Sequence, residues 1–504
     1  MASIMTTSLV VIYFIAMLAI GAWASRKVKS SEDYIVAGRS LGFWFFVILI
    51  VASTTSGMTI LGVAGLGYTA GWPSIWEQIF VPLTAAICIL FYGTKLHKIS
   101  EKMGYMTVQD YFAHRFYSPK LMRALSGLAV VVTSGIYLVG QYTAISIILV
   151  WLFGITHTEA LLIAGIIVLM YVTLGGLYAV AWTNMIQGAF MIGGVLIVAP
   201  LVIKAAGGLT HINTVLASID PNMVNLAYPQ MHPPYAGYAF MTPLYLVSFF
   251  FLLAIGLGSA PHIVNNVLAV KKDKYFKFAP FVAFGIYVVI MYLVKIVGFG
   301  AKTMVSDGII NVPYADYSFV AAVNYALPSI VWPLFAVMVL SAVMSTTDRL
   351  MLTIGTSVSW DIYKNLINPK ANDKKITAVS RAVVIVAAAL TLYLAVKPPQ
   401  LLALLIWMGI GVMLSTFVMP LIAGLYWKRA TREGALASMA VGFSTAIAFG
   451  FVHQFIVKLP MHFSMYSFVL AVITMIVVSL VTKNPSDKVL KDTLTGPFIQ
   501  TKNR

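Results

Sequence analysis

Two apolar stretches of this chain are interrupted by clusters of small hydroxyl-bearing residues. The first is Ala52-Ser53-Thr54-Thr55-Ser56-Gly57, and the second is Ser341-Ala342-Val343-Met344-Ser345-Thr346-Thr347-Asp348. Inside a bilayer, polar side chains and non-helical backbone persist only where protein or a water-filled cavity satisfies them. Hydroxyl and carbonyl oxygens are also the ligands that hard cations prefer. The two clusters together therefore predict a cation site within the membrane.

The second cluster has the spacing of a ligand set. Ala342, Ser345 and Thr346 are spaced i, i+3, i+4 and so share one face of a helix. A helix broken between residues 52 and 57 would leave backbone carbonyls beside them, giving about five neutral oxygens. Such a set suits a monovalent ion that must also leave, whereas calcium sites usually add carboxylates, so sodium is the natural candidate. The alternative is that the hydroxyls bond to carbonyls of their own helix and merely bend it.

Ionisable residues within apolar stretches are costly and therefore suggest function. Glu77, followed by Gln78, could bind an amine or hydroxyl of a solute, or be an interfacial carboxylate near water. Lys295 could be the counter-charge of an anionic solute or the partner of Glu77, or could extend to the interface. Asp348, one turn beyond Ser345, could attract a leaving cation or form a structural pair, and its neighbour Arg349 does not face it.

Composition defines the setting of these sites. The chain has 504 residues, of which 60% are hydrophobic and 10% are charged, against about 25% charged in soluble proteins. We predict a single polytopic, all-α membrane domain over residues 1–504. The net charge of +17 does not indicate nucleic acid, because most Lys and Arg residues lie in the gaps that follow every second span. By the positive-inside rule, the N-terminus is then outside and the C-terminus cytoplasmic.

Apolar runs of about 20 residues predict spans. We predict thirteen, over 5–25, 41–71, 74–96, 121–154, 157–179, 182–206, 238–261, 279–300, 325–358, 376–396, 400–427, 435–456 and 463–482.

Spans two to six and seven to eleven form two sets of five. Because five is odd, a repeated unit of five must be inverted relative to its partner. Each set opens with an interrupted helix, at Ser56-Gly57 and at Gly256-Leu257-Gly258-Ser259-Ala260-Pro261. Matched interruptions point to a transporter's binding site near the midplane. The alternative is that the glycines only permit close helix packing.

Several motifs resemble the sodium:solute symporter family. They are Asp33-Tyr34 with Gly38-Arg39-Ser40-Leu41-Gly42, Ala52-Ser53 with Ser56-Gly57, Gly175-Gly176 through Ala181-Trp182-Thr183 to Gln187-Gly188, Pro261-His262, and Ala342-Val343-Met344-Ser345-Thr346. The resemblance covers essentially the whole chain in the same order. Lys397-Pro398-Pro399 and the stretch Gly424-Leu425-Tyr426-Trp427-Lys428-Arg429-Ala430 to Gly434-Ala435-Leu436 make it closest to the pantothenate and monocarboxylate branch.

The resemblance implies a LeuT-type core of two inverted five-helix repeats. The first repeat would cover 41–206 and the second 238–396, with an extra helix at 5–25, trailing helices over 400–482 and a short cytoplasmic tail. It also implies a sodium site made by the carbonyls of Ala52, Thr55 and Ala342 and the hydroxyls of Ser345 and Thr346. Some members carry an aspartate, associated with a second sodium, where this chain has Asn184, so we expect one sodium ion per cycle.

The resemblance further places certain helices beside the solute. The residues predicted to line that pocket, each of which could instead be a packed side chain, are Ser53, Gly57, Glu77, Gln78, Tyr137, Gln141, Gly258, His262, Lys295, Trp407, Ser415 and Thr416.

The function predicted from the sequence is sodium-coupled import of a small monocarboxylate or pantothenate-like carboxylate by alternating access. The first alternative is a proline-type amino-acid symporter, and more remote ones are a proton-translocating respiratory subunit, a channel or a solute-sensing receptor. We expect no enzyme activity, because no catalytic signature or metal-type histidine spacing occurs. The expected partners are sodium, a small solute and the bilayer of the cell membrane, with the protein acting as a monomer.

Overall fold

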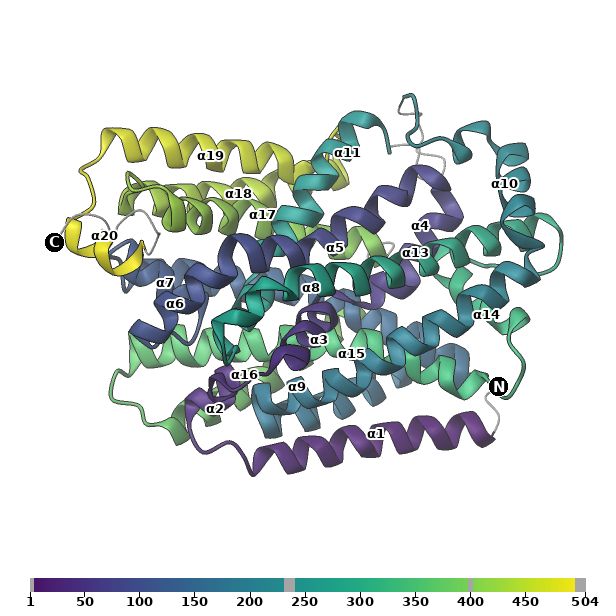
Figure 1. The fold of residues 1–504 in the computed structure, drawn as a ribbon, viewed down its shortest axis with the longest axis horizontal. Coiled ribbons are helices and arrows are strands. Elements are labelled where there is room, and N and C mark those ends of the chain that lie inside the picture. Colours follow the sequence, from purple (N-terminus) through teal and green to yellow (C-terminus); the bar gives the residue numbers. More distant parts are fainter. Residues whose placement is uncertain (1–3, 231–240, 398–401, 495–504) are drawn as a thin grey trace.

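The computed structural model describes residues 4–230, 241–397 and 402–494 as a bundle of helices that run side by side (Figure 1). The expected starts of the seventh and eleventh spans, at 238 and 400, lie outside the described residues. In chain order the helices are α1 (Ile4–Ser25), α2 (Ser31–Val36), α3 (Phe43–Thr54), α4 (Val63–Ala70), α5 (Glu77–Ile87), α6 (Thr94–Met103), α7 (Val108–Arg115), α8 (Leu121–Phe153), α9 (His157–Ala205), α10 (Gly208–Ile219), α11 (Pro243–Phe250), α12 (Pro261–Val264), α13 (Ala279–Ser306), α14 (Ser318–Ala326), α15 (Trp332–Thr356), α16 (Asp373–Ala395), α17 (Leu402–Tyr426), α18 (Arg432–Phe455), α19 (Phe463–Val481) and α20 (Asp487–Thr493).

The predicted helical membrane fold is confirmed. In the described residues, ten helical stretches are long and apolar enough to cross a membrane, and two bent pairs bring the number to twelve. The 49 residues of α9 would extend about 73 Å, more than twice the hydrocarbon core, and α9 is interrupted at Gly176, whose φ is 53° and ψ −144°. Counting α9 as two crossings gives thirteen in the described part of the chain, as predicted. The two ends of the chain accordingly lie at opposite ends of the bundle (Figure 1).

The helices differ in how deeply they are buried. In its most apolar stretch α15 has 94% of its residues buried, whereas the corresponding share in α1, α16 and α19 is 28%. The helix that carries the second hydroxyl cluster is therefore central, and the outer helices present apolar side chains toward lipid. One boundary differs from the prediction: the ninth span was expected from residue 325, but α14 ends at Ala326 and α15 begins at Trp332.

The two predicted interruptions are real bends. The stretch Phe43–Thr54 meets Met58–Ala70 at 64°, and Pro243–Ser259 meets Pro261–Ala269 at 49°. At the first bend Thr55 is extended, with φ −83° and ψ 112°, and at the second Ala260 is extended, with φ −64° and ψ 131° before Pro261. Proline cannot donate a helical hydrogen bond, and it disfavours helical backbone in the residue before it. The ends of the two bent spans meet where Leu41 pairs with the backbone around Val270.

Candidate functional site

The backbone of the first bend and the side chains of α15 meet at one buried point. The Ser345 hydroxyl oxygen lies 3.0 Å from the Ala52 carbonyl oxygen, 3.4 Å from that of Thr55 and 3.1 Å from that of Ala342. The Thr346 hydroxyl lies 3.1 Å from the Ala52 carbonyl and 2.7 Å from that of Thr55. All five residues are 0% exposed. The five oxygens predicted as sodium ligands are thus gathered by two different helices.

The geometry also explains why these oxygens are available. At the break the amides four residues on bond elsewhere: that of Ser56 donates to the Thr59 hydroxyl, and that of Thr59 donates to the Ser56 carbonyl. The carbonyls of Ala52 and Thr55 instead accept from the hydroxyls of Ser345 and Thr346. Calcium, an ion of size similar to sodium, sits about 2.3–2.6 Å from its oxygen ligands. Two oxygen ligands that subtend a right angle at such an ion lie roughly 3.4 Å apart. The oxygens of this site would therefore need to move by only a few tenths of an ångström to bind a cation.

The hydroxyls of the first cluster behave differently from those of the second. Ser53, Thr54 and Thr55 each donate to a carbonyl of their own helix, at Leu49, at Ile50 and Val51, and at Val51 respectively. This is the helix-bending alternative considered for the sequence. The first cluster therefore offers backbone oxygens to the centre, and only the second offers hydroxyls.

A small cavity separates the two bends. It has a volume of about 10 Å³, room for about one water molecule. Its lining residues are Thr54, Ser56, Met58, Thr59, Val63, Glu77, Val81, Tyr137, Leu253, Leu257, Met291 and Ile410. Of the residues predicted to contact solute, Glu77 and Tyr137 line it, and the hydroxyl residues Thr54, Ser56 and Thr59 were not predicted as solute contacts. Ser56 and Thr59 belong to the first bend itself, so the break in that helix was the signal that could have identified them.

A buried ion pair stands at the edge of this cavity. Lys295 Nζ on α13 lies 3.1 Å from Glu77 Oε2 on α5, and both side chains are 0% exposed. The other oxygen of the carboxylate, Glu77 Oε1, has no hydrogen-bond partner among the residues that the structure describes. One of the two roles predicted for Lys295, the partner of Glu77, is therefore present in the geometry. The pair leaves a buried acceptor on a residue that lines the cavity.

Other predicted solute residues lie around the bends without lining the cavity. Gln141 accepts from the Gly57 amide at 2.9 Å, so it supports the first break. The Ser53 hydroxyl accepts from the amide of Asn266 at 3.1 Å and thereby links the first bent span to the second. A Cβ on Gly57 would lie 2.2 Å from that of Ala144, so close packing explains this glycine.

The remaining predicted residues take packing positions. The ring of His262 lies edge-on to Tyr137 at 5.7 Å, and the ring of Trp407 lies 4.8 Å from that of Phe249. Gly258 lies close to the Thr84 carbonyl. The side-chain amide of Gln78 donates to the carbonyls of Ser74 and Ile75. The hydroxyls of Ser415 and Thr416 donate to carbonyls of α17.

Two residues predicted to act in ion exit or coupling have polar atoms that are buried and unsatisfied. Asp348 is 0% exposed; one carboxylate oxygen accepts a hydrogen bond from Tyr171, and the other has no partner among the described residues. Asn184 on α9 is also 0% exposed, and within the described part of the chain neither atom of its amide has a hydrogen-bond partner. Because Asp348 is buried, a role in attracting the leaving cation would require the inner end of the bundle to open.

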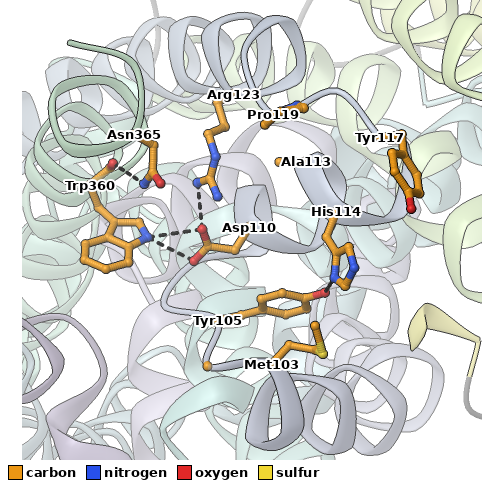
Figure 2. Close-up of a pocket in the computed structure, with 11 residues that line it drawn as sticks. Met103, Tyr105, Asp110, Ala113, His114, Tyr117, Pro119, Arg123, Trp360 and Asn365 are labelled. Atoms are coloured by element: carbon orange, nitrogen blue, oxygen red, sulfur yellow. Dashed lines mark hydrogen bonds and ion pairs between the residues drawn. The ribbon is translucent and has the colours of Figure 1, made fainter. Parts of the chain in front are cut away.

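A polar network that the sequence did not predict lies at the end of the bundle at which the C-terminus lies, and Figure 2 shows three of its members, Asp110, Arg123 and Trp360. Arg123 at the start of α8 lies 2.6 Å from Asp110 on α7 and 3.1 Å from Asp361, which follows α15. Asp110 also accepts from the indole of Trp360 at 3.0 Å, and Asp361 accepts from Thr107 at 2.8 Å. The network thus fixes the end of the helix that carries Ser345 and Thr346.

Beside this network is a cavity of about 400 Å³ that also holds a tyrosine–histidine contact. Burial lowers the pKa of His114 and raises that of the Tyr105 phenol. Both groups are therefore neutral near pH 7, and they share a hydrogen bond between the phenol oxygen and Nδ1 of His114. The contact is held by neutral partners and not by a charge.

Replacing Arg123 with Leu is expected to destabilise the protein markedly. Removing one partner of a buried ion pair typically costs about 3–5 kcal/mol, because it leaves an uncompensated charge, and here two carboxylates would be left. Thermal unfolding in detergent should show a melting temperature lower by several degrees. Lys120→Leu, at an exposed position just before the same helix, is the matched control and should change little. Equal melting temperatures for the two variants would contradict a structural role for the network.

Two bent spans with a small cavity between them are the pattern of a secondary transporter built from repeated helical units. The chain belongs to the sodium:solute symporter family, whose family model matches residues 34–442. Membership confirms the resemblance seen in the motifs and implies coupling of transport to sodium.

Curated relatives have more than one solute. The chain is 26% identical over 496 residues to the osmoregulated proline transporter OpuE of Bacillus subtilis, covering 94% of each protein. It is 27% identical over 439 residues to a sodium/pantothenate symporter of Haemophilus influenzae, covering 86% of this chain and 87% of that one. The two relatives are equally similar to this chain, so neither name decides its solute.

Solved structures share the fold. A substrate-bound, outward-open Na⁺-coupled sialic acid symporter superposes with a TM-score of 0.78 at 18% identity, covering 96% of this chain and 99% of that one. MHP1, a nucleobase-cation-symport-1 family transporter, superposes with a TM-score of 0.52 at 17% identity. The predicted LeuT-type architecture is thereby confirmed.

Proposed function

We propose that this protein imports a small organic carboxylate together with one sodium ion. The observation that carries this proposal is the set of five buried oxygens brought together by the bent first span and α15. A sodium ion there would bond to both helices at once and hold them in one arrangement. Loss of the ion would free the helices to separate, so ion binding and helix position are linked.

The polar network of Arg123, Asp110 and Asp361, called the inner network below, connects the cation site to the end of the bundle at which the C-terminus lies. Asp361 lies on the continuation of α15, the helix that carries the hydroxyls of Ser345 and Thr346. Arg123 on α8 forms ion pairs with both Asp361 and Asp110 on α7. Opening toward the cytoplasm would separate Asp361 from Arg123 and draw α15 away from the first bend. Coupling between sites of this kind is typically worth 1–3 kcal/mol and acts equally in both directions.

One sodium ion is enough to drive accumulation. When one sodium ion accompanies a zwitterion, one net charge moves, and a membrane potential contributes about 2.3 kcal/mol per 100 mV, or roughly fifty-fold accumulation. When it accompanies a monovalent anion, no net charge moves, and the sodium gradient alone drives accumulation. We propose a single ion because Asn184, and not a carboxylate, occupies the position associated with a second sodium in some members. The test is the ratio of charge moved to solute taken up in proteoliposomes, which should be one for an electroneutral zwitterion and zero for a monovalent anion.

For the solute, the first candidate is a monocarboxylate or pantothenate-like carboxylate that also carries a hydroxyl. The hydroxyls of Ser56 and Tyr137 line the cavity and could donate to a carboxylate. The unpartnered oxygen of Glu77 then needs a donor from the solute. A solute with a carboxylate at one end and a donor at the other meets both requirements, which pyruvate does not.

The second candidate is a proline-type amino acid. The specific observation in its favour is that Glu77 lines the cavity while Lys295 is engaged in the ion pair. An ammonium group would satisfy Glu77 Oε1 more strongly than a hydroxyl, because hydrogen bonds between charged groups are the stronger ones.

Uptake into proteoliposomes tests both candidates. Labelled pantothenate, lactate, pyruvate and proline are offered with an inward sodium gradient, and choline chloride replaces sodium chloride in the control. We expect sodium-dependent uptake of a solute with a hydroxyl or ammonium donor, and no uptake of pyruvate. Equal uptake in choline and sodium would contradict the proposed coupling.

We further propose that the protein lies in the cell membrane with the N-terminus outside and acts as a monomer. The orientation is supported by the basic residues near the end of the bundle that carries α6, α7 and α20, which is the end where the C-terminus lies (Figure 1).

A further inference from the structure

A cluster of three metal-ligating side chains lies at the end of the bundle that carries α6 and the C-terminus, away from the transport site (Figure 1). His97 and Glu101 are four residues apart on α6 and so share one face of that helix. Asp273 comes from the segment Asp273–Lys277, which leads into α13. The ligand atoms of all three residues lie within 4.8 Å of one another.

The histidine is held in a fixed orientation. Its ring is 0% exposed, and Nδ1 lies 3.1 Å from the carbonyl oxygen of Val267. A carbonyl can only accept, so Nδ1 carries a proton, and Nε2 is the ring nitrogen that faces the two carboxylates. Metal-binding histidines are commonly oriented in this way, by donating their other ring nitrogen to a carbonyl or carboxylate.

The contacts of Nε2 have the spacing of ligands that share an ion. Nε2 lies 3.1 Å from an oxygen of Asp273 and 3.4 Å from an oxygen of Glu101. Zinc binds nitrogen and oxygen at about 2.0–2.2 Å. Two such ligands lie about 3.0 Å apart at right angles and about 3.4 Å apart at the tetrahedral angle.

The direction of these contacts also favours an ion. Despite these short distances, Nε2 has no hydrogen-bond partner within residues 4–230, 241–397 and 402–494, and neither does the near oxygen of Asp273. The ligands of a shared ion point at the ion and not at one another, whereas a protonated Nε2 would be expected to aim its hydrogen at one carboxylate. Without a positive centre the imidazole lone pair and two carboxylates would repel one another.

The neighbouring basic side chains, Lys98 and Arg39, do not occupy the space between His97, Glu101 and Asp273. Lys98 Nζ lies 3.9 Å from the other oxygen of Asp273, and its side chain is 54% exposed. Arg39 donates to Glu32, Ser100 and the carbonyl of Tyr105.

We propose that His97, Glu101 and Asp273 form a binding site for a zinc-class divalent cation. Imidazole with carboxylates is a ligand set that suits zinc, and three protein ligands leave a fourth position for water. The side chains of Glu101 and Asp273 are 51% and 40% exposed, so an ion can enter from solution. A bound ion would tie the end of α6 to the segment before α13.

The experiment measures zinc bound to the purified, chelator-treated full chain in detergent, in competition with a chromophoric zinc chelator. The ligand variant carries Glu101→Gln with Asp273→Asn, two partly exposed changes that should not prevent folding. The matched control carries Glu433→Gln with Asp487→Asn, which removes two exposed carboxylates near the same end of the bundle. We expect the wild type and the control to bind one zinc more per chain than the ligand variant, and His97→Gln to behave as the ligand variant does.

Thermal unfolding supplies a second readout. Zinc should raise the melting temperature of the wild type and the control by a few degrees and leave that of the ligand variant unchanged, because the ion binds only the folded site. Equal zinc uptake by all proteins would overturn the proposal. A wild type that is stabilised only by lowering the pH, with no difference in zinc uptake, would overturn it in favour of a proton on Nε2.

Discussion

Replacing Ser345 and Thr346 together with alanine is expected to abolish the sodium dependence of uptake. Each hydroxyl that contacts a charged group contributes about 1.5–3 kcal/mol, so losing two of five ligands should weaken sodium binding by more than a hundredfold. The measurement is solute uptake into proteoliposomes as a function of sodium concentration. The half-saturating sodium concentration should rise beyond the range that can be tested.

The neighbouring residue offers a matched control. The Thr347 hydroxyl donates to the Val343 carbonyl within its own helix at 2.8 Å, so Thr347→Ala removes an equally buried hydroxyl without removing a ligand. Thr346→Ser should retain sodium dependence, because the hydroxyl remains. If the double variant takes up solute with unchanged sodium dependence, the ion lies elsewhere. Because Ser345 and Thr346 also satisfy the carbonyls of Ala52 and Thr55, thermal unfolding of the double variant is measured in parallel.

The sequence predicts the fold and the position of the bends because local chemistry determines both. Long apolar runs cross a bilayer as helices, and Gly256 to Pro261 combines two glycines with a proline, a combination that favours a break. The spacing of Ala342, Ser345 and Thr346 places them on one face without any knowledge of tertiary contacts. Spacing along a helix does not determine hydrogen-bond partners. The sequence therefore predicts which residues could form the cation site, but not which hydroxyls of the first bend donate to carbonyls of their own helix.

The inner network could not be predicted because its members are dispersed along the chain. Asp110, Arg123 and Asp361 lie in three separate segments, and in the sequence Arg123 is only one of the many Lys and Arg residues whose distribution predicts the orientation. The same holds for Asp273, which lies far along the chain from His97. Charged residues at the ends of spans are expected at the membrane–water interface in any case. Nothing in the sequence therefore indicates that some of them form ion pairs with one another.

Glu77 and Lys295 form an intermediate case. Two opposite charges in separate apolar spans each need a partner, so the sequence could name the pair as one of several possibilities. It could not show which of the two also faces the cavity, because that depends on the packing of α5 and α13 around the first bend. In the geometry Glu77 lines the cavity and Lys295 supports it.

Changing Glu77 to Gln is expected to weaken solute binding by about tenfold or more. A hydrogen bond between a charged carboxylate and a solute donor is worth about 1.5–3 kcal/mol, which corresponds to a tenfold to roughly 150-fold change in affinity. The measurement is the KM for uptake of the preferred solute. The single change would also leave Lys295 buried and unpaired, at a cost of about 3–5 kcal/mol in stability, so KM alone would be ambiguous.

The double variant Glu77→Gln with Lys295→Met separates the two effects. Replacing both partners of a buried ion pair is often neutral in stability, so its melting temperature should recover toward that of the wild type. If Glu77 contacts the solute, the KM of the double variant should nevertheless remain high. Recovery of both stability and KM would show that the pair is only structural. Lys295→Met alone distinguishes the remaining role: unchanged carboxylate affinity would exclude Lys295 as a counter-charge for the solute.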